Sequence, residues 1–144
     1  MKSEVFSDFQ LVGARLGKVE VTNKFINLPP TNDLEINIDL GNSECVITPF
    51  DDHLEGILQQ YINFSATLKS QKDEFIKISL MIEGCFIASE KDEERFKQML
   101  MLNGNTALYS ILRSHVITIS SLALGEGKIV LPMVNFAKLI EEQQ

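Results

Sequence analysis

Apolar and polar residues alternate strictly in the middle of the chain. In "LEINIDL", residues 34–40, every second residue is apolar and the others are acids or Asn. Segments 56–70 and 73–89 repeat the alternation, and the polar turn "QKD" joins them. A period of two is typical of a strand with one buried face, and a short turn makes a hairpin. Three antiparallel strands are predicted, with Ile36 and Ile38 as core residues.

The segment before these strands has a looser alternation. "FQLVGARLGKVEV", residues 9–21, contains Gly13 and Gly17, and glycine within a strand often marks a bulge or a bend. A long, bent first strand is therefore predicted. It completes a set of four.

A loop is predicted between the first two strands. "NKFINLPPTND", residues 23–33, contains Pro29 and Pro30, which fix φ and remove two backbone donors. Phe25 and Ile26 lie in this loop without a strand register that would bury them. We expect both side chains to be exposed.

The period changes after residue 89. "EKDEERFKQMLMLNG" begins with acids and ends at Gly104, which predicts a short helix over 92–102 with this glycine as a left-handed cap. Residues 116–119 favour a strand by propensity, but apolar residues recur at helical spacing from 108 to 124 and two glycines follow. This spacing predicts a helix of about twenty residues.

Strands followed by helices indicate one α+β domain spanning residues 1–144, with a four-stranded antiparallel sheet and helices packed on one face. The outer face of the long helix carries small and apolar residues instead of charged pairs. Such a face is typical of an interface, although a weakly polar solvent face is the alternative. The predicted interface residues are Ser110, Ser114, Ile117, Thr118, Ser121 and Leu124.

Composition and charge narrow the function. Hydrophobic residues make up 44% of the chain and charged residues 23%, as in ordinary globular domains, and no apolar run reaches the ~20 residues of a membrane span. The net charge of −7 disfavours nucleic acid and suits basic or unfolded polypeptide. The first residues lack the apolar core of a secretory signal, so a cytoplasmic location is expected.

No motif supports catalysis. The "GEG" sequence follows a helix and so cannot form a phosphate cradle, and His115 has no nucleophile at a suitable spacing. Cys45 and Cys85 stand alone in apolar surroundings, where cysteine is usually a small buried hydrophobe. One cluster consists of residue types that can bind metals, but its spacing does not fit one helical face and is that of a solvated turn. Its members are Asp51, Asp52, His53 and Glu55. We expect no enzyme activity, no metal and no cofactor.

Several short motifs occur in an order and spacing that resemble those of the SecB family of cytosolic protein-export chaperones. The resemblance extends over nearly the full length. The matching residues are Phe9, Gln10 and Leu11, then Gly84 and Phe86, then Leu108, Tyr109 and Arg113, and finally Leu131, Val134, Asn135 and Phe136.

The resemblance implies a homotetramer, a dimer of dimers, that holds unfolded preproteins without ATP. It places Asn135 as the N-cap of a terminal helix near the crossover loop, with an apolar client groove between helix and loop. The residues that the resemblance assigns to this groove are Phe25, Ile26, Leu28, Phe136, Leu139 and Ile140.

Docking to the translocase motor is one implied partnership. Positions where export chaperones carry docking acids align with Lys18, Thr22 and Ser79. This departure favours one alternative, a SecB-like chaperone that guards the antitoxin of a toxin–antitoxin system. A second alternative, from another class, is a small-ligand carrier or an enzyme on the same α+β fold.

Overall fold

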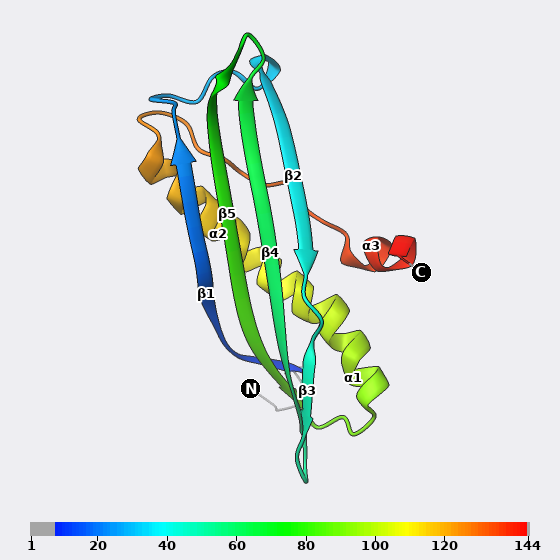
Figure 1. The fold of residues 1–144 in the computed structure, drawn as a ribbon. Helices are drawn as coiled ribbons and strands as arrows, with labels where there is room; N and C mark the ends of the chain where they lie inside the picture. The colour runs from blue at the N-terminus through cyan, green and yellow to red at the C-terminus, as the bar shows by residue number, and fades with distance from the viewer. Residues whose placement is uncertain (1–7, 144) are drawn as a thin grey trace, which may run out of the picture.

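The structure, a computed structural model, describes residues 8–143. Figure 1 shows one elongated sheet with helices behind it. The elements in chain order are β1 (Gln10–Asn23), η2 (Thr31–Asp33), β2 (Leu34–Asn42), β3 (Val46–Pro49), β4 (Leu54–Leu68), β5 (Gln71–Ala88), α1 (Glu93–Met99), η3 (Leu100–Gly104), α2 (Asn105–Ala123) and α3 (Phe136–Gln143).

The sheet is antiparallel and has the strand order β1-β5-β4-β2. β3 also pairs with β4, next to the part of β4 that β2 does not reach. The predicted α+β class is confirmed, but the predicted number of four strands is wrong, because the described chain has five. β3 was not predicted because it has only four residues and ends at Pro49. Such a strand is too short for a period of two to be recognised.

The predicted bend of the first strand is confirmed. The pairing of β1 with β5 shifts register between Leu11 and Gly13 and again between Leu16 and Lys18, so both shifts lie at or next to the two glycines of the strand. An added Cβ at Gly17 would lie 2.4 Å from Met81 Cε, so the end of that flexible side chain would have to move.

The predicted break between two helices is wrong. α1, the π-helical turn η3 and α2 follow one another without interruption, and Gly104 has right-handed helical angles, φ −63° and ψ −49°. This glycine faces the sheet, since an added Cβ would lie 3.3 Å from Leu58 Cδ2, slightly closer than ordinary contact, and 3.5 Å from Phe86 Cε2. The long helix itself, α2, is confirmed.

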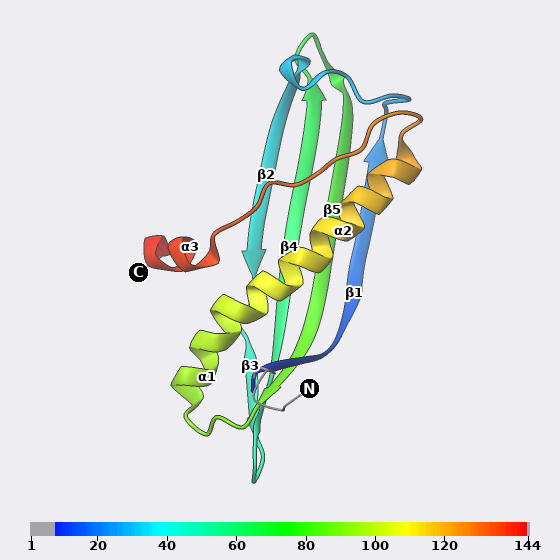
Figure 2. The same ribbon diagram turned by 180° about the vertical axis from the view of Figure 1, so that it is seen from behind.

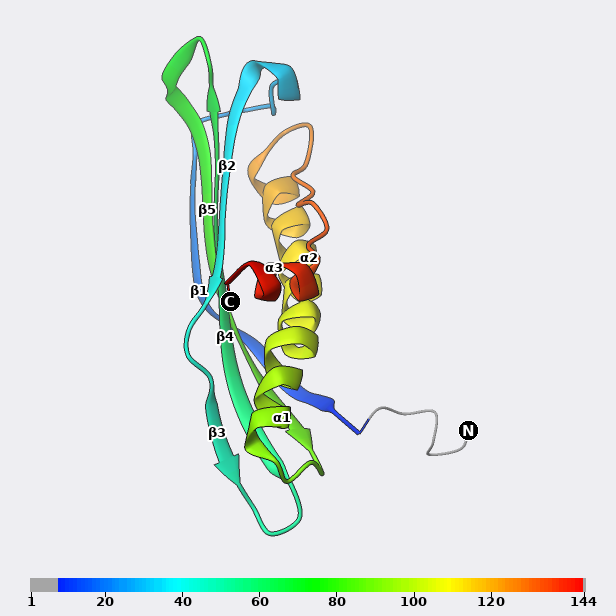
Figure 3. The same cartoon turned by 90° about the vertical axis from the view of Figure 1, so that its right-hand side faces the viewer.

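The molecule has two layers, as Figure 3 shows edge-on. The continuous helix α1–η3–α2 crosses one face of the sheet diagonally (Figure 2), and the other face is open (Figure 1). Gly56 and Gly84 allow the close approach, because an added Cβ would lie 2.6 Å from Leu100 Cδ1 and 2.7 Å from Leu108 Cδ2, respectively. The side chains between the layers form the core.

An extended connector, residues 124–135, returns from the end of α2 across the helix-bearing face of the sheet (Figure 2). It leads to α3, which lies beyond the edge of β2 (Figure 1). Asn135 caps α3, because its side-chain Oδ1 accepts a hydrogen bond from Lys138 N at 3.1 Å. The cap implied by the family resemblance is therefore present.

Candidate functional site

A groove of about 230 Å³ lies on the helix-bearing face of the sheet, between the crossover loop, the connector and strands β2 and β4. Its lining is mostly apolar: Leu28, Thr31, Leu34, Ile36, Ile38, Phe64, Ala66, Lys128, Ile129, Val130 and Pro132.

The floor of the groove exists because the helix layer is narrower than the sheet. Ile36 pairs with Ala66 and Ile38 with Phe64, and paired residues share a face of the sheet. On β4 both partners are buried, whereas on β2 Ile36 and Ile38 are 42% and 41% exposed. The expectation that these two isoleucines are core residues is wrong for the single chain. They form an apolar surface that is open to solvent.

The connector is the second wall, and side chains of α2 hold it in place. Ser120 Oγ accepts a hydrogen bond from Ile129 N at 2.8 Å, and Arg113 Nε donates one to the Leu131 carbonyl at 3.1 Å. The hydroxyl of Tyr109 donates to the carbonyl of Pro132. Three polar side chains from one helix thus fix an extended segment that belongs to no sheet.

The crossover loop is the third wall, and it is tied to the connector. Gly125 N donates to the Ile26 carbonyl at 2.6 Å, and Leu28 N donates to the Glu126 carbonyl at 3.2 Å. Asn23 closes the base of the loop, since its side chain accepts from Phe25 N at 2.9 Å and donates to the Phe25 carbonyl at 2.8 Å.

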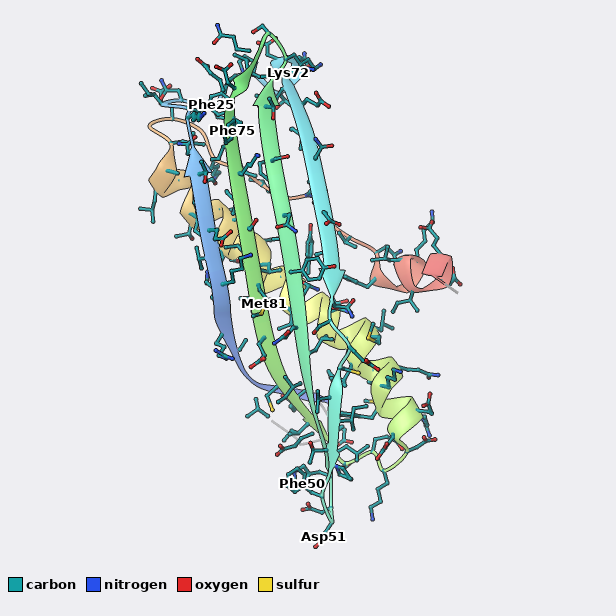
Figure 4. All side chains as sticks on the ribbon, in the orientation of Figure 1. Phe25, Phe50, Asp51, Lys72, Phe75 and Met81 are labelled. Carbon is teal, nitrogen blue, oxygen red and sulfur yellow. The ribbon has the colours of Figure 1, made fainter. Side chains whose placement is uncertain are left out.

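The predicted loop residues have different surroundings. Phe25 is only 7% exposed and belongs to the core, so the expectation that it is exposed is wrong, whereas Ile26 is 82% exposed as expected. Leu28 is half-buried and lines the groove. Figure 4 shows Phe25 beside the upper end of the sheet, at the start of the loop. The loop folds its aromatic residue inward because a buried Phe ring contributes more apolar contact than an Ile side chain.

The terminal helix does not lie near the crossover loop, contrary to the sequence prediction. Phe136 is buried and packs edge-on against Tyr109, with 5.7 Å between ring centroids. Leu139 and Ile140 are half-buried on α3, which contacts η3. Figure 1 shows the loop and α3 well apart. The six predicted groove residues are therefore not one site.

Of the predicted groove residues on α3, Ile140 lines a different hollow. This hollow of about 480 Å³ lies between α3 and the first helical turns, and Ile140, Ala137, Met101 and Leu102 contribute its apolar lining. Glu94, Lys97 and Gln98 line it as well. It lies in the region of α3 and α1, whereas the groove lies beneath the crossover loop.

The predicted interface face of α2 is mostly exposed. Ser110, Ser114, Thr118 and Ser121 are exposed and Ile117 is half-buried. The hydroxyls of Ser114, Thr118 and Ser121 donate to carbonyls one turn earlier in the helix, which leaves a smooth surface of low polarity. Leu124 was wrongly assigned to this face, because it follows the end of the helix and is buried.

A second apolar surface lies along the edge strand β1, whose pairing with the first strand of another copy belongs to the predicted dimer of dimers. Leu11, Val19 and Val21 of the edge strand β1 are exposed, and Leu122 of α2 is 82% exposed. The signal was present in the alternation of β1, but the pattern could not show that the helix layer leaves this edge uncovered. Exposed apolar surface of this kind usually marks an interaction site.

The cluster of metal-ligand types is a charged turn between β3 and β4. Asp51 and Asp52 are exposed, and His53 lies between the carboxylates of Asp52 and Glu55. Hydrogen bonds to these two carboxylates raise the pKa of His53, and the bond to His53 lowers the pKa of Asp52. Figure 4 shows Asp51 at the lower tip of the molecule. Within residues 8–143, no group of three or more such side chains is arranged to hold a metal ion.

The two cysteines are free thiols and are half-buried. Burial raises the pKa of the Cys85 thiol, and the charges of Glu55 and Glu83 raise it further. A raised pKa makes a thiol a weaker nucleophile at neutral pH, which agrees with the structural role predicted for Cys85.

The positions aligned with docking acids lie on the open face of the sheet. There Lys18 pairs with Met81, and Ser79 pairs with Glu20. Lys24 and Lys77 place their ammonium groups 4.6 and 4.7 Å from the centroid of the Phe75 ring, which Figure 4 shows near the upper end of β5. This part of the face is rich in lysine and does not present an acidic patch.

No helix in the described part of the chain is long and apolar enough to cross a membrane.

Comparisons by sequence found no matching family model and no matching curated protein. A solved structure matches in fold: the SecB-like chaperone Rv1957 of Mycobacterium tuberculosis, in complex with a ChAD peptide from the antitoxin HigA1, Rv1956. The TM-score is 0.62 and the identity 13%, over 88% of this chain and 90% of the other. The chain therefore has a SecB-like fold.

Proposed function

We propose that this protein is a chaperone that binds non-native polypeptide in the groove beside β2. The observation that carries the proposal is the open apolar floor made by Ile36 and Ile38, which are 42% and 41% exposed. A folded domain gains nothing by leaving such a floor uncovered. An unfolded client offers apolar segments that would cover it, at about 25 cal/mol per Å² of buried apolar surface and with little sequence demand.

The proposed mechanism is holding without catalysis. Binding by apolar burial needs no hydrolysis, so we propose that neither nucleotide nor metal is required and that the protein is not an enzyme. The lining of the groove supports this proposal, since Lys128 is its one charged residue and the rest are apolar except Thr31. A small-ligand site would instead combine a closed cavity with converging polar groups.

Two client classes fit the proposal, and we favour an antitoxin over exported preproteins in general. The structural neighbour was solved with an antitoxin peptide. In addition, the open face of this sheet carries Lys18, Thr22 and Ser79 where the family resemblance would place acids for the translocase motor. Both observations support a cytoplasmic chaperone of a toxin–antitoxin system. A role in protein export would instead require that the translocase motor binds directly to the open face of the sheet.

We also propose that the protein works as a dimer of dimers. The exposed apolar residues of β1 support one contact, through pairing of first strands, and the low-polarity face of α2 supports the other. Several copies of one groove would hold a long client at several points, because the second contact of a tethered chain forms at high effective concentration.

The test is suppression of aggregation of a chemically denatured client, with light scattering as the readout. We expect suppression without nucleotide, and we expect it to persist in EDTA. A requirement for ATP or a divalent ion would refute the holding mechanism.

For the client class, the purified protein is titrated with the antitoxin of any toxin–antitoxin pair encoded beside it, and separately with the translocase motor. Binding of the motor alone would favour export.

A further inference from the structure

The outer edge of β2 carries unpaired backbone groups beside the groove. At one end of the strand Lys69 N donates to the Asp33 carbonyl at 2.9 Å, and at the other end Ser43 N donates to the Gln59 carbonyl at 3.1 Å. Odd-numbered residues of β2 therefore direct their backbone groups toward β4. Since antiparallel strands alternate, the N–H and carbonyl groups of Ile36, Ile38 and Leu40 point to the free edge.

The same residues provide the side chains of the groove. Ile36 and Ile38 line it, and no strand lies beyond them in the described sheet. Figure 1 shows that β2 is an edge strand and that only the end of the connector and α3 lie outside it. One short segment of chain thus offers apolar side chains on one face and backbone donors and acceptors at its edge. Only another extended backbone is complementary to both.

The charges on β2 argue against a second copy of this chain as the occupant. In a two-fold antiparallel pairing centred on Asn37, Ile36 would lie opposite Ile38, and Glu35 would lie opposite Asp39 on the open face. This register would place two acid pairs in direct opposition, and the registers centred on Ile36 or Ile38 would still bring the four acids of the two copies together on the open face. Like charges directly opposite one another destabilise a strand pair, and inward or edge charges of this kind are how proteins prevent sheet-to-sheet association. An unlike chain without acids at these positions is not repelled.

We infer that a client segment binds by strand addition, as an extra antiparallel strand along the free edge of β2. This inference rests on the proposed function and specifies its chemistry. The client segment is extended, with apolar residues at every second position facing the groove and uncharged or basic residues between them on the side of Glu35 and Asp39. Main-chain hydrogen bonds supply affinity independent of sequence, and the alternating side chains fix the register.

The register makes the inference testable with N-methylated peptides. In an antiparallel pair, residues whose side chains face Ile36 and Ile38 also direct their N–H groups to them. The probe is the heptapeptide acetyl-TVKLTVK-amide, whose Val, Leu and Val would face the groove. Methylation of those three backbone nitrogens should weaken binding at least ten-fold. Methylation of the Lys, Thr and Lys nitrogens, which would point to solvent, should leave the dissociation constant within about three-fold.

A charge comparison tests the same register from the protein side. Replacing both Lys of the probe by Glu should weaken binding several-fold, and the difference should vanish in the double variant Glu35→Gln, Asp39→Asn, because opposite charges across a strand pair are favourable. Neither acid lines the groove. If both methylated peptides bind alike, or only the second binds weakly, the antiparallel strand addition is refuted.

The outcomes also separate this inference from the proposed function. If the unmethylated probe binds and the methylation pattern has no effect, the groove recognises side chains only and the chaperone proposal stands. If the probe fails to bind although the protein suppresses aggregation, strand addition is likewise refuted. If no client is protected and no peptide binds, the proposed function itself fails.

Discussion

The hydroxyl of Ser120 accepts a hydrogen bond from the backbone N–H of Ile129 at 2.8 Å, and it donates one to the carbonyl of Ile117 at 3.2 Å. Ser120 is completely buried near the C-terminal end of α2, on the side of the helix that contacts the connector. This single hydroxyl joins the long helix to the wall of the groove. It explains why a small polar residue is buried in the last turns of α2.

Replacing Ser120 by alanine should lower the free energy of unfolding by about 1 to 3 kcal/mol, because the buried N–H of Ile129 would lose its partner. The matched control is Ser114→Ala, whose exposed hydroxyl bonds only within the helix, and which should change stability by less than about 0.5 kcal/mol. Urea unfolding of both variants checks this. Equal stability of the two would show that the connector is not held through Ser120.

The double variant Ile36→Ser, Ile38→Ser should weaken client binding strongly and cost about 2 to 3 kcal/mol of stability in total, because each side chain is about 40% exposed and therefore contributes only part of the ~1.5 to 3 kcal/mol of a fully buried Ile. Phe25→Ser should do the reverse. It removes a buried aromatic side chain and should cost about 3 to 5 kcal/mol. Thermal melts and client titrations on both variants measure the two effects. A stable Phe25 variant that no longer binds would reverse the assignment.

Ile36 and Ile38 show which properties of a residue can be predicted from the sequence pattern and which depend on packing. Alternation in "LEINIDL" correctly predicted a strand with one apolar face, because a period of two is a property of the chain itself. It could not predict that the helix layer stops short of β2, since the width of a layer depends on how segments distant in sequence pack. Phe25 was misplaced for the same reason, because its burial depends on Asn23, which holds the loop against the carbonyl of Ala123 at 2.9 Å.

The elements were predicted where their signal is local. The strands of the hairpin and the long helix each follow from residues within one turn or one alternation, whereas the N-cap at Asn135 was implied by the family resemblance. The role of Gly104 was predicted wrongly because a glycine that ends a helix and a glycine that lies inside a helix against a sheet look alike in sequence. Its neighbours Leu58 and Phe86 are more than fifteen residues away along the chain, and only packing reveals them.

The ring of His53 should titrate above its ordinary pKa of 6.5, because Asp52 and Glu55 accept its hydrogen bonds. The folded state raises this pKa, so the contribution of the charged ring is present below pH 6.5 and is lost as the pH rises through the folded value. The pKa of Asp52 is lowered from 3.8, so its contribution is lost as the pH falls below that value. The interaction is therefore favourable between these two limits.

NMR titration of the imidazole protons measures the effect directly. In the double variant Asp52→Asn, Glu55→Gln the midpoint should fall toward the ordinary value, since both acceptors of the charged ring are neutralised. The global free energy of unfolding should change little, because the turn is exposed and solvent screens the charges. An unchanged midpoint would show that the carboxylates do not hold the ring in solution.

A two-fold pairing of β1 with a second copy would place opposite charges across from each other, whereas a two-fold pairing of β2 places acids together. This difference predicts which edge strand pairs between copies. Lys24 N donates to the Phe75 carbonyl at 2.8 Å, so even-numbered residues in this part of β1 face β5 and Val19 directs its backbone groups to the free edge. In a two-fold pairing centred on Val19, Lys18 lies opposite Glu20 of a second copy. This arrangement brings together two favourable charge pairs and the exposed apolar side chains.

Lys18→Glu should therefore weaken the dimer, by about ten-fold in its dissociation constant, because both favourable pairs become repulsive. The swap Lys18→Glu, Glu20→Lys should restore wild-type association, since it exchanges the partners of each pair. Lys72→Glu is the matched control, because Lys72 is exposed at the turn side of β5 and far from this edge (Figure 4). Sedimentation velocity at micromolar concentration gives the distribution of species. If the swap does not restore the dissociation constant of the wild type, first strands do not pair in this register. If Lys72→Glu weakens the dimer as much as Lys18→Glu, net charge alone governs association.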